Sequence, residues 1–338
     1  MDIEEFDFHL PKHLIAKWPA TERSSAKLIV LDRLNKNYTQ DIFANITRYI
    51  SDDYFLVLNN TKVNKARLYT RKDTGGKVEI LLLNKINNYE YYCLTKGKIS
   101  DKQRVYIDKY QCDIIKIYGK KERKIIFYDI TGSKIMELYG EVPIPPYLKR
   151  EANDIDKKYY QTVYSKVLGS VAAPTAGLHF DESTLYSLKL KGVEILEITL
   201  DVSYGTFKPI DKKDINEHEM HSENYYIKKD VMDRINYLKK EGKKLVAVGT
   251  TVVRALEDAS NDEGLVEKWG NDETDLFIKP GYKFKIVDAM ITNFHLPKSS
   301  LFILVSAFTG TNLLKETYNY AIENNFRFYS YGDGMLIK

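Results

Sequence analysis

Two imidazoles and two carboxylates are concentrated in the segment His218-Glu219-Met220-His221-Ser222-Glu223. Histidine and glutamate are frequent acid–base groups, because burial and neighbouring charges tune the pKa of either side chain. His218 and His221 could also share one face at i, i+3 and bind zinc, but the HExxH spacing is absent and no third ligand is evident. The segment therefore favours acid–base chemistry, with a zinc site and a structural polar cluster as alternatives.

A run of small residues at 169–180, GSVAAPTAGLHF, is unusual in a chain rich in lysine and tyrosine. Two glycines and a proline predict a loop rather than a helix, with backbone N–H groups open to a ligand and His179 at the exit of the loop. Tight packing of this loop against the core is the alternative.

Two further motifs stand where α/β proteins bind ligands. Gly249-Thr250-Thr251 follow an apolar strand and open a helix, whose unpaired N–H groups can hold a carboxylate or phosphate. The segment 292–300 places an amide, an aromatic ring, an imidazole and hydroxyls before the apolar run 301–308, which suits recognition of a polar ring. Capping and core packing are the alternative for this segment. No GxGxxG follows a predicted strand, which disfavours a Rossmann-type nucleotide domain.

The elements that must position these motifs alternate between strand and helix. Residues 244–248 predict a buried strand, and Thr250 opens a helix that continues through Ala259. Asp181 is predicted to cap a helix that Gly192 ends before a strand at 193–200. This alternation is typical of an α/β domain.

The segment 61–154 has a different pattern. Short β-branched or aromatic runs at 77–83, 89–95, 104–107, 112–118 and 124–128 are separated by polar turns, which predicts an antiparallel β module. It holds 20 basic and 12 acidic side chains, whereas the rest of the chain holds 31 and 35. A basic surface of this kind can bind a polyanion such as nucleic acid, although a solvated lysine-rich surface is the alternative.

The predicted architecture is an α/β main domain, residues 1–60 plus 155–338, interrupted by an inserted small antiparallel β-barrel domain, residues 61–154. A chain of 338 residues with 43% hydrophobic and 29% charged residues is typical of a globular protein. Its N-terminus lacks the basic region of a signal peptide and no apolar run could cross a bilayer, so we expect a cytoplasmic protein without membrane contact. Cys93 and Cys112 show no CxxC spacing and are expected to be core thiols.

Taken in chain order, these motifs resemble the S-adenosylmethionine:tRNA ribosyltransferase-isomerase family of queuosine biosynthesis. The similarity extends over essentially the whole chain. It includes the segments 6–11, 58–63, 75–79, 160–164, 169–180, 205–207, 218–223, 248–251, 291–300 and 332–333.

The resemblance implies a monomeric transferase-isomerase with the same two-part architecture. Its reaction would transfer the ribosyl moiety of S-adenosylmethionine to 7-aminomethyl-7-deazaguanine at the wobble position of a tRNA with a GUN-type anticodon. Isomerisation of the ribosyl group to an epoxycyclopentanediol would give epoxyqueuosine-tRNA, with release of adenine and methionine. S-adenosylmethionine would be a ribosyl-donating cosubstrate, and no metal is expected.

On this basis we assign roles to the motif residues. The base that removes the acidic C5′ proton is placed in the cluster His218, His221 and Glu223, and His179 or His295 is expected to protonate or orient adenine. Residues expected to contact S-adenosylmethionine are Ser170, Ala172, Thr175, Gly177, Phe207, Gly249, Thr250, Thr251, Arg254, Asn293 and Phe294. The residues expected to clamp tRNA are Lys62, Lys65, Arg67, Arg71 and Lys77.

The chain departs from the family pattern at four positions. Asp201 replaces a histidine, Lys208 and Lys27 replace arginines, and Lys279 replaces an aromatic residue or histidine. Lysine keeps the charge of arginine but loses its bidentate fork. A tRNA-binding relative with impaired catalysis, or a zinc-dependent hydrolase or deaminase, are the alternative functions.

Replacing His218 or His221 by alanine is expected to abolish turnover while leaving tRNA binding nearly intact, because these side chains are assigned to proton transfer. Nucleoside analysis and a tRNA binding assay on each variant measure the two effects separately. Normal turnover in both variants would refute the assignment.

Overall fold

The computed structural model describes residues 1–202 and 210–338, and it divides into two compact units. The first unit contains Met1–Lys62, Gln161–Val167 and Ala173–Lys338, and the second contains Val63–Tyr160 and Leu168–Ala172. The sequence placed the second boundary at 154/155, before helix α2 (Asp154–Tyr159). In the structure α2 belongs to the second unit, where its fully buried Asp156 pairs with Arg150 at 2.5 and 2.7 Å.

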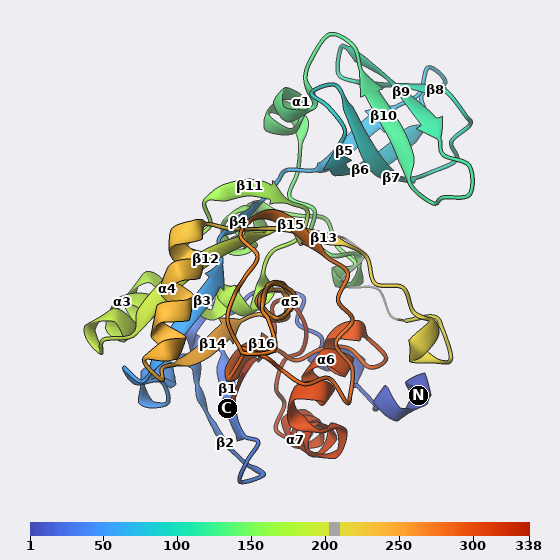
Figure 1. The fold of residues 1–338 in the computed structure, drawn as a ribbon. Helices are drawn as coiled ribbons and strands as arrows, with labels where there is room; N and C mark the ends of the chain where they lie inside the picture. The colour runs from blue at the N-terminus through green and yellow to red at the C-terminus, as the bar shows by residue number, and fades with distance from the viewer. Residues whose placement is uncertain (203–209) are drawn as a thin grey trace. The chain divides into compact units, whose positions relative to one another are not determined.

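Nine strands of the described residues form the mixed sheet of the first unit, in the order β15-β13-β12-β3-β14-β16-β17-β1-β2 (Figure 1). The strands are β1 (Lys27–Asp32), β2 (Asn37–Ile42), β3 (Tyr54–Asn59), β12 (Glu194–Leu200), β13 (Glu223–Ile227), β14 (Lys244–Val248), β15 (Gly270–Thr274), β16 (Ala289–Asn293) and β17 (Gly334–Ile337). The central neighbours β12, β3, β14 and β16 are all parallel. Their carboxyl ends therefore meet at one edge, where open α/β sheets bind ligands.

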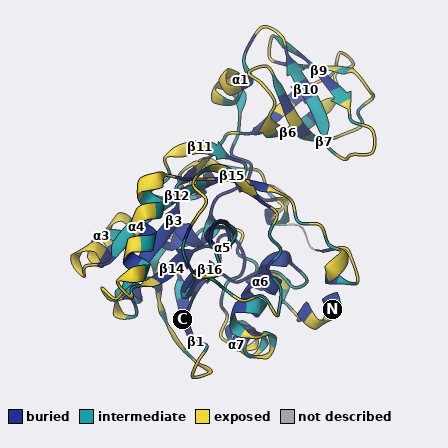
Figure 2. Ribbon diagram, in the orientation of Figure 1, coloured by how far each residue is buried: buried dark blue, intermediate teal, exposed yellow. Residues whose placement is uncertain are grey.

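The sheet of the first unit is buried on both faces. Leu56, Leu58, Val246 and Val248 belong to one core cluster, to which the connecting helices contribute Leu188 and other apolar residues. The intervening residues of β3 and β14 point to the opposite face and are also buried, so these central strands are largely dark blue in Figure 2. A two-sided core of this kind fixes the strand ends in position.

The helices of the first unit connect these strands. The α-helices are α3 (Glu182–Leu190), α4 (Lys229–Lys240), α5 (Thr250–Ala259), α6 (Ser300–Thr309) and α7 (Thr311–Glu323). Short 3-10 turns are η1 (Ile3–Phe6), η2 (Lys12–Leu14), η3 (Arg23–Ser25), η4 (Phe43–Arg48), η6 (Thr175–His179) and η8 (Ile215–Glu217). The predicted strand at 244–248, the helix opened by Thr250 and the cap at Asp181, whose carboxylate accepts from Thr184 N at 2.7 Å, are confirmed.

The second unit contains a closed antiparallel barrel, as the sequence predicted, in the order β10-β7-β6-β5-β8-β9. Its strands are β5 (Arg67–Arg71), β6 (Lys77–Lys85), β7 (Glu90–Lys96), β8 (Gln103–Ile107), β9 (Tyr110–Lys116) and β10 (Arg123–Phe127). The unit also contains α1 (Gly132–Tyr139), η5 (Pro146–Leu148) and α2, and the connecting strands β4 (Thr61–Val63) and β11 (Val167–Ser170) pair with each other. Cys93 and Cys112 are free thiols in the barrel core.

Among the helices within residues 1–202 and 210–338, none combines the length and the apolarity that are needed to span a bilayer.

Candidate functional site

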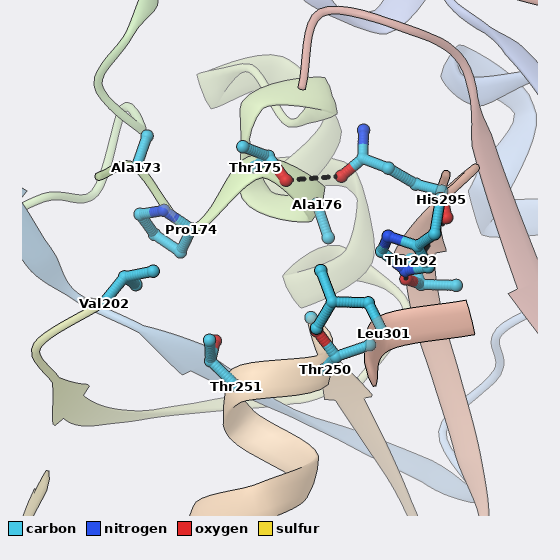
Figure 3. A pocket seen from close by; sticks show the side chains of 12 residues that line it. Ala173, Pro174, Thr175, Ala176, Val202, Thr250, Thr251, Thr292, His295 and Leu301 are labelled. Carbon is cyan, nitrogen blue, oxygen red and sulfur yellow. Dashed lines mark hydrogen bonds between the residues drawn. The ribbon is translucent and has the colours of Figure 1, made fainter. Parts of the chain in front are cut away.

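A pocket with about 340 Å³ of empty space, its open mouth included, lies at the carboxyl ends of the parallel strands of the first unit (Figure 3). Val202 follows β12, Gly249 follows β14, and Asn293 ends β16. The residues that line the pocket are Ala173, Pro174, Thr175, Ala176, Val202, Gly249, Thr250, Thr251, Thr292, Asn293, His295 and Leu301. Three of the sequence motifs therefore meet at this edge of the sheet.

The turn from β14 into α5 brings a helix N-terminus to the pocket. Gly249 adopts φ +100°, a backbone conformation that disfavours side chains with a Cβ, and its N–H donates to Ile291 O on the neighbouring β16 at 2.8 Å. No side-chain hydrogen bond caps α5, and its first intrahelical bond runs from Val253 N to Gly249 O. The N–H groups of the first turn and the helix dipole are thus available to an anion.

Asn293 stands at the centre of a buried polar network. Its Oδ1 accepts a hydrogen bond from Thr175 Oγ1 at 2.8 Å, and its Nδ2 donates to His179 Nε2 at 3.1 Å. Because the amide nitrogen has no lone pair, Nε2 must be the unprotonated nitrogen of a neutral His179. Burial is the main cause that lowers the pKa of His179 to about 3, and Arg327 and Arg23 act in the same direction.

Burial also favours the neutral form of His295. Its Nε2 lies 2.8 Å from Thr292 Oγ1, and its backbone N–H donates to the Tyr318 hydroxyl at 2.9 Å. Burial lowers the pKa of His295 to about 3. With pKa values this low, neither His179 nor the pocket residue His295 is an imidazolium at neutral pH.

A buried ion pair connects α5 to the antiparallel edge of the sheet. Arg254 of α5 pairs with Glu223 of β13, and both side chains are almost fully buried. Arg254 also donates to Leu276 O at 3.0 Å and to Thr274 O at 3.1 Å, which holds β15 and the segment that follows it. Its donors are used by the protein itself, so Arg254 acts as a positioning residue for α5.

The predicted histidine cluster is not part of the described pocket lining. Among the described residues, His218 and His221 do not belong to the pocket lining. His218 is half-buried with its ring 5.4 Å from Phe277, and His221 is exposed. Burial lowers the pKa of His218, and the charge of nearby His221 lowers it further.

Asp201 directly precedes the pocket residue Val202. It accepts a hydrogen bond from Thr61 Oγ1, at the carboxyl end of β3, at 3.2 Å. Burial raises the pKa of Asp201, and the negative charge of Glu223 raises it further, against the opposing effect of the Thr61 hydrogen bond. A carboxylate thus lies next in sequence to a residue of the pocket lining.

Other predicted contact residues have structural partners. Phe294 is fully buried in an aromatic cluster, 5.0 Å from Phe328 and 5.2 Å from Tyr318. Gly177 leaves room for Tyr164, whose hydroxyl would lie 2.0 Å from a Cβ at that position. Ser170 and Ala172 belong to the second unit, where Ser170 Oγ donates to Ala172 O at 2.6 Å. Phe207 and Lys208 lie outside the described residues.

Two of the lysines that depart from the family pattern contact nearby groups of the protein. Lys27 Nζ donates to Asn324 O at 2.8 Å and so caps the carboxyl end of α7. Lys279 donates to Asn216 and lies 5.9 Å from the centre of the Phe277 ring.

Sequence reasoning missed several residues of the pocket. Most of them lie inside or beside the recognised segments 169–180 and 292–300, so these two segments could have indicated them as pocket residues. They are Ala173, Pro174, Ala176, Thr292 and Leu301. Val202 carried no chemical signal, and only its place after β12 could have indicated it.

The predicted tRNA-binding residues divide into two groups. Arg67 is buried, with its guanidinium Nε 3.2 Å from Glu79 and a terminal nitrogen donating to Ile144 O at 3.0 Å. Lys62, Lys65, Arg71 and Lys77 are exposed. Arg71 is paired in register with Lys77 on one side and Tyr106 on the other, which forms a row of basic and aromatic residues on the outer face of the barrel.

A metal centre has no support in the part of the chain that the structure describes. There, no three His, Cys, Asp or Glu side chains are grouped so that they could hold an ion.

Comparisons with known proteins reveal similarity over the full length of the chain. A family model described as "Queuosine biosynthesis protein" matches residues 3–337. The S-adenosylmethionine:tRNA ribosyltransferase-isomerase of Aquifex aeolicus is 48% identical over 340 residues, and that of Sulfurihydrogenibium sp. is 46% identical over 344 residues. Both alignments cover 100% of each chain. The crystal structure of S-adenosylmethionine tRNA ribosyltransferase from Thermotoga maritima is similar with a TM-score of 0.58 at 32% identity, over 99% of this chain and 100% of that one.

The neutrality of the buried histidines predicts a dependence of stability on pH. His179 and His295 have folded-state pKa values near 3, below the ordinary 6.5. The unfolded chain binds more protons below pH 6.5, so their stabilising effect is present above that pH and is lost as the pH falls from 6.5 towards 3. Each histidine contributes a slope of up to about 1.4 kcal/mol per pH unit in the free energy of unfolding.

Urea denaturation of wild type and His179→Gln at several pH values measures this slope, which is expected to be shallower by about one proton in the variant. Thr292→Val is the control, because it removes a partner of His295 but no titratable group. A slope equal to that of wild type in His179→Gln would contradict the neutral assignment.

Proposed function

This chain belongs to the queuosine biosynthesis family of S-adenosylmethionine:tRNA ribosyltransferase-isomerases, and we propose that it transfers and isomerises the ribosyl group of S-adenosylmethionine onto tRNA. The observation that carries the proposal is the family match over residues 3–337, with relatives of that name up to 48% identical from end to end. The pocket at the carboxyl ends of the parallel strands supplies a location for the cosubstrate.

The proposed acceptor is 7-aminomethyl-7-deazaguanine at the wobble position of a tRNA with a GUN-type anticodon. The products are epoxyqueuosine-tRNA, adenine and methionine. We infer a monomeric cytoplasmic enzyme without a metal requirement. The target base must leave the anticodon stack to reach a pocket of this kind.

The pocket provides complementary groups for the parts of S-adenosylmethionine. The first turn of α5, at Gly249, Thr250 and Thr251, can bind the methionine carboxylate through backbone N–H groups and the helix dipole. Thr175 and Asn293, on the opposite wall, offer hydroxyl and amide groups to the adenosine. Arg254 contributes through its pairing with Glu223, which holds α5 in place.

The chemical step requires a base for the C5′ proton, which the adjacent sulfonium makes acidic. The candidate acceptors are the side chains of the cluster His218, His221 and Glu223, in which burial and the charge of His221 lower the pKa of His218. Glu223 is ion-paired with Arg254. His179 and His295 orient groups of the pocket rather than protonate adenine, because both are neutral.

The barrel supplies a basic surface for tRNA. Arg71, Lys77 and Tyr106 form one row across three strands, and Lys65 is exposed near the start of the second unit. Basic side chains neutralise phosphates, and a tyrosine ring can stack on an unpaired base. Arg67 supports β5 from within rather than binding RNA directly.

The deciding experiment incubates the purified protein with S-adenosylmethionine and tRNA that carries 7-aminomethyl-7-deazaguanine. Mass spectrometry of small molecules and digested nucleosides is expected to detect adenine, methionine and epoxyqueuosine together, with Asp201 a tolerated substitution. tRNA binding without either small product would instead indicate a catalytically impaired relative.

Neutralising three barrel charges in Lys65→Gln/Arg71→Gln/Lys77→Gln is expected to weaken tRNA binding and to reduce the slope of log K against log salt by about 2 to 3. The control, Lys124→Gln/Lys134→Gln/Lys157→Gln, removes the same net charge from lysines that are ion-paired to nearby carboxylates. Equal effects of the two triple variants would reject a localised clamp in favour of a general charge effect.

A further inference from the structure

The amide of Asn293 has hydrogen-bonding capacity that the protein does not use. The residue is 2% exposed and lines the pocket, where Figure 3 draws its bond to Thr175. An asparagine amide offers two N–H donors and two oxygen lone pairs. Thr175 uses one lone pair and His179 one donor, so among the described residues one N–H donor and one oxygen lone pair of this amide remain for a ligand.

The orientation of this amide is set from both ends. The Thr175 hydroxyl can donate to Oδ1, and the neutral His179 ring accepts from Nδ2. The ring itself is fixed, because Phe43 packs 5.2 Å from its centre and its Nε2 would lie 3.2 Å from a Cβ at Gly334. Reversing the amide would require a different tautomer of His179 and a reversed Thr175 hydroxyl, so the unused donor and acceptor keep their places.

We propose that Asn293 reads the 6-amino edge of the adenine of S-adenosylmethionine, with Thr175 and His179 as positioning residues that make the pocket reject a 6-oxo purine. The inference rests on the proposed function and names a specificity determinant within that site. An amide pairs with adenine by accepting from the 6-amino group and donating to the adjacent ring nitrogen. A buried amide is suited to this role because a hydrogen bond is stronger in the low dielectric of the protein interior than in water.

The geometry opposes hypoxanthine, the 6-oxo counterpart of adenine. Its O6 would face Oδ1, so two acceptors would meet and both would be buried without a donor. A freely rotating amide could reverse and satisfy the oxo group, but the Thr175 and His179 bonds oppose this reversal. Discrimination between adenine and hypoxanthine therefore depends on Thr175 and His179 as much as on Asn293.

The test compares kcat/KM for S-adenosylmethionine and S-inosylmethionine by the release of adenine or hypoxanthine in the presence of substrate tRNA. Wild type is expected to prefer the adenine compound by about 10- to 100-fold, the usual discrimination of a bidentate amide–base pair. Asn293→Ala is expected to lose activity with S-adenosylmethionine and to reduce the preference to about threefold or less, because both unused amide positions disappear.

The positioning variants have a distinct signature. Thr175→Val/His179→Ala is expected to reduce the preference mainly by gaining activity on S-inosylmethionine, since the released amide can reverse. The single variant His179→Gln keeps Thr175, and its new side-chain oxygen can accept from Asn293 Nδ2. It is therefore expected to show the preference of the wild type. A purely structural role for His179 would lower both activities and leave their ratio unchanged.

Asn236→Ala is the matched control, because Asn236 also makes two amide hydrogen bonds, to Val266 O and from Val266 N, each at 2.8 Å, and does not belong to the described pocket lining. Its preference is expected to equal that of wild type. Equal wild-type use of both cosubstrates, or an unchanged preference in Asn293→Ala, would overturn the inference. Absence of wild-type turnover with either compound would instead refute the proposed function.

Discussion

The buried ion pair between Arg254 and Glu223 is the constraint on which the geometry of the site depends. Isolated charges are costly inside a protein, so each side chain requires the other, and loss of one partner costs about 3–5 kcal/mol. The pair fixes α5 against β13, while the other donors of Arg254 hold β15 and the segment beyond it. The first turn of α5 therefore faces the pocket in one defined orientation.

The described part of the pocket binds through dipoles and neutral polar groups. Its walls contain a helix N-terminus, hydroxyls, an amide and a neutral imidazole, and none of its described lining residues has a charged side chain. A substrate that itself carries a sulfonium and a carboxylate would meet no competing charge in this lining. Fixed dipoles also stabilise developing charge without reorganisation, which favours catalysis.

In the proposed function, the first unit binds the small molecule and the second unit binds the tRNA. Small-molecule contacts come from loops at the carboxyl ends of parallel strands, which a two-sided hydrophobic core holds rigid. Arg71 and Lys77 are exposed and paired in register across two strands of the barrel, which fits the proposed phosphate contacts. Insertion of the barrel between β3 and β12 leaves the parallel pairing of these two strands intact.

The sequence by itself determined the elements and the motifs, because apolar periodicity, caps and glycine turns act over a few residues. It thereby predicted the α/β alternation, the inserted barrel and the turn at Gly249, whereas the segment 169–180, predicted as a loop, contains the end of β11 and the 3-10 helix η6. Only the tertiary structure decided which of these motifs meet. Thr175 and Asn293 are brought together by strand order, and Phe294 is enclosed by other rings. Arg254 pairs with the buried carboxylate of Glu223, and Arg67 pairs with the partly exposed carboxylate of Glu79. Burial and partner choice are long-range properties, and no local pattern of residues encodes them.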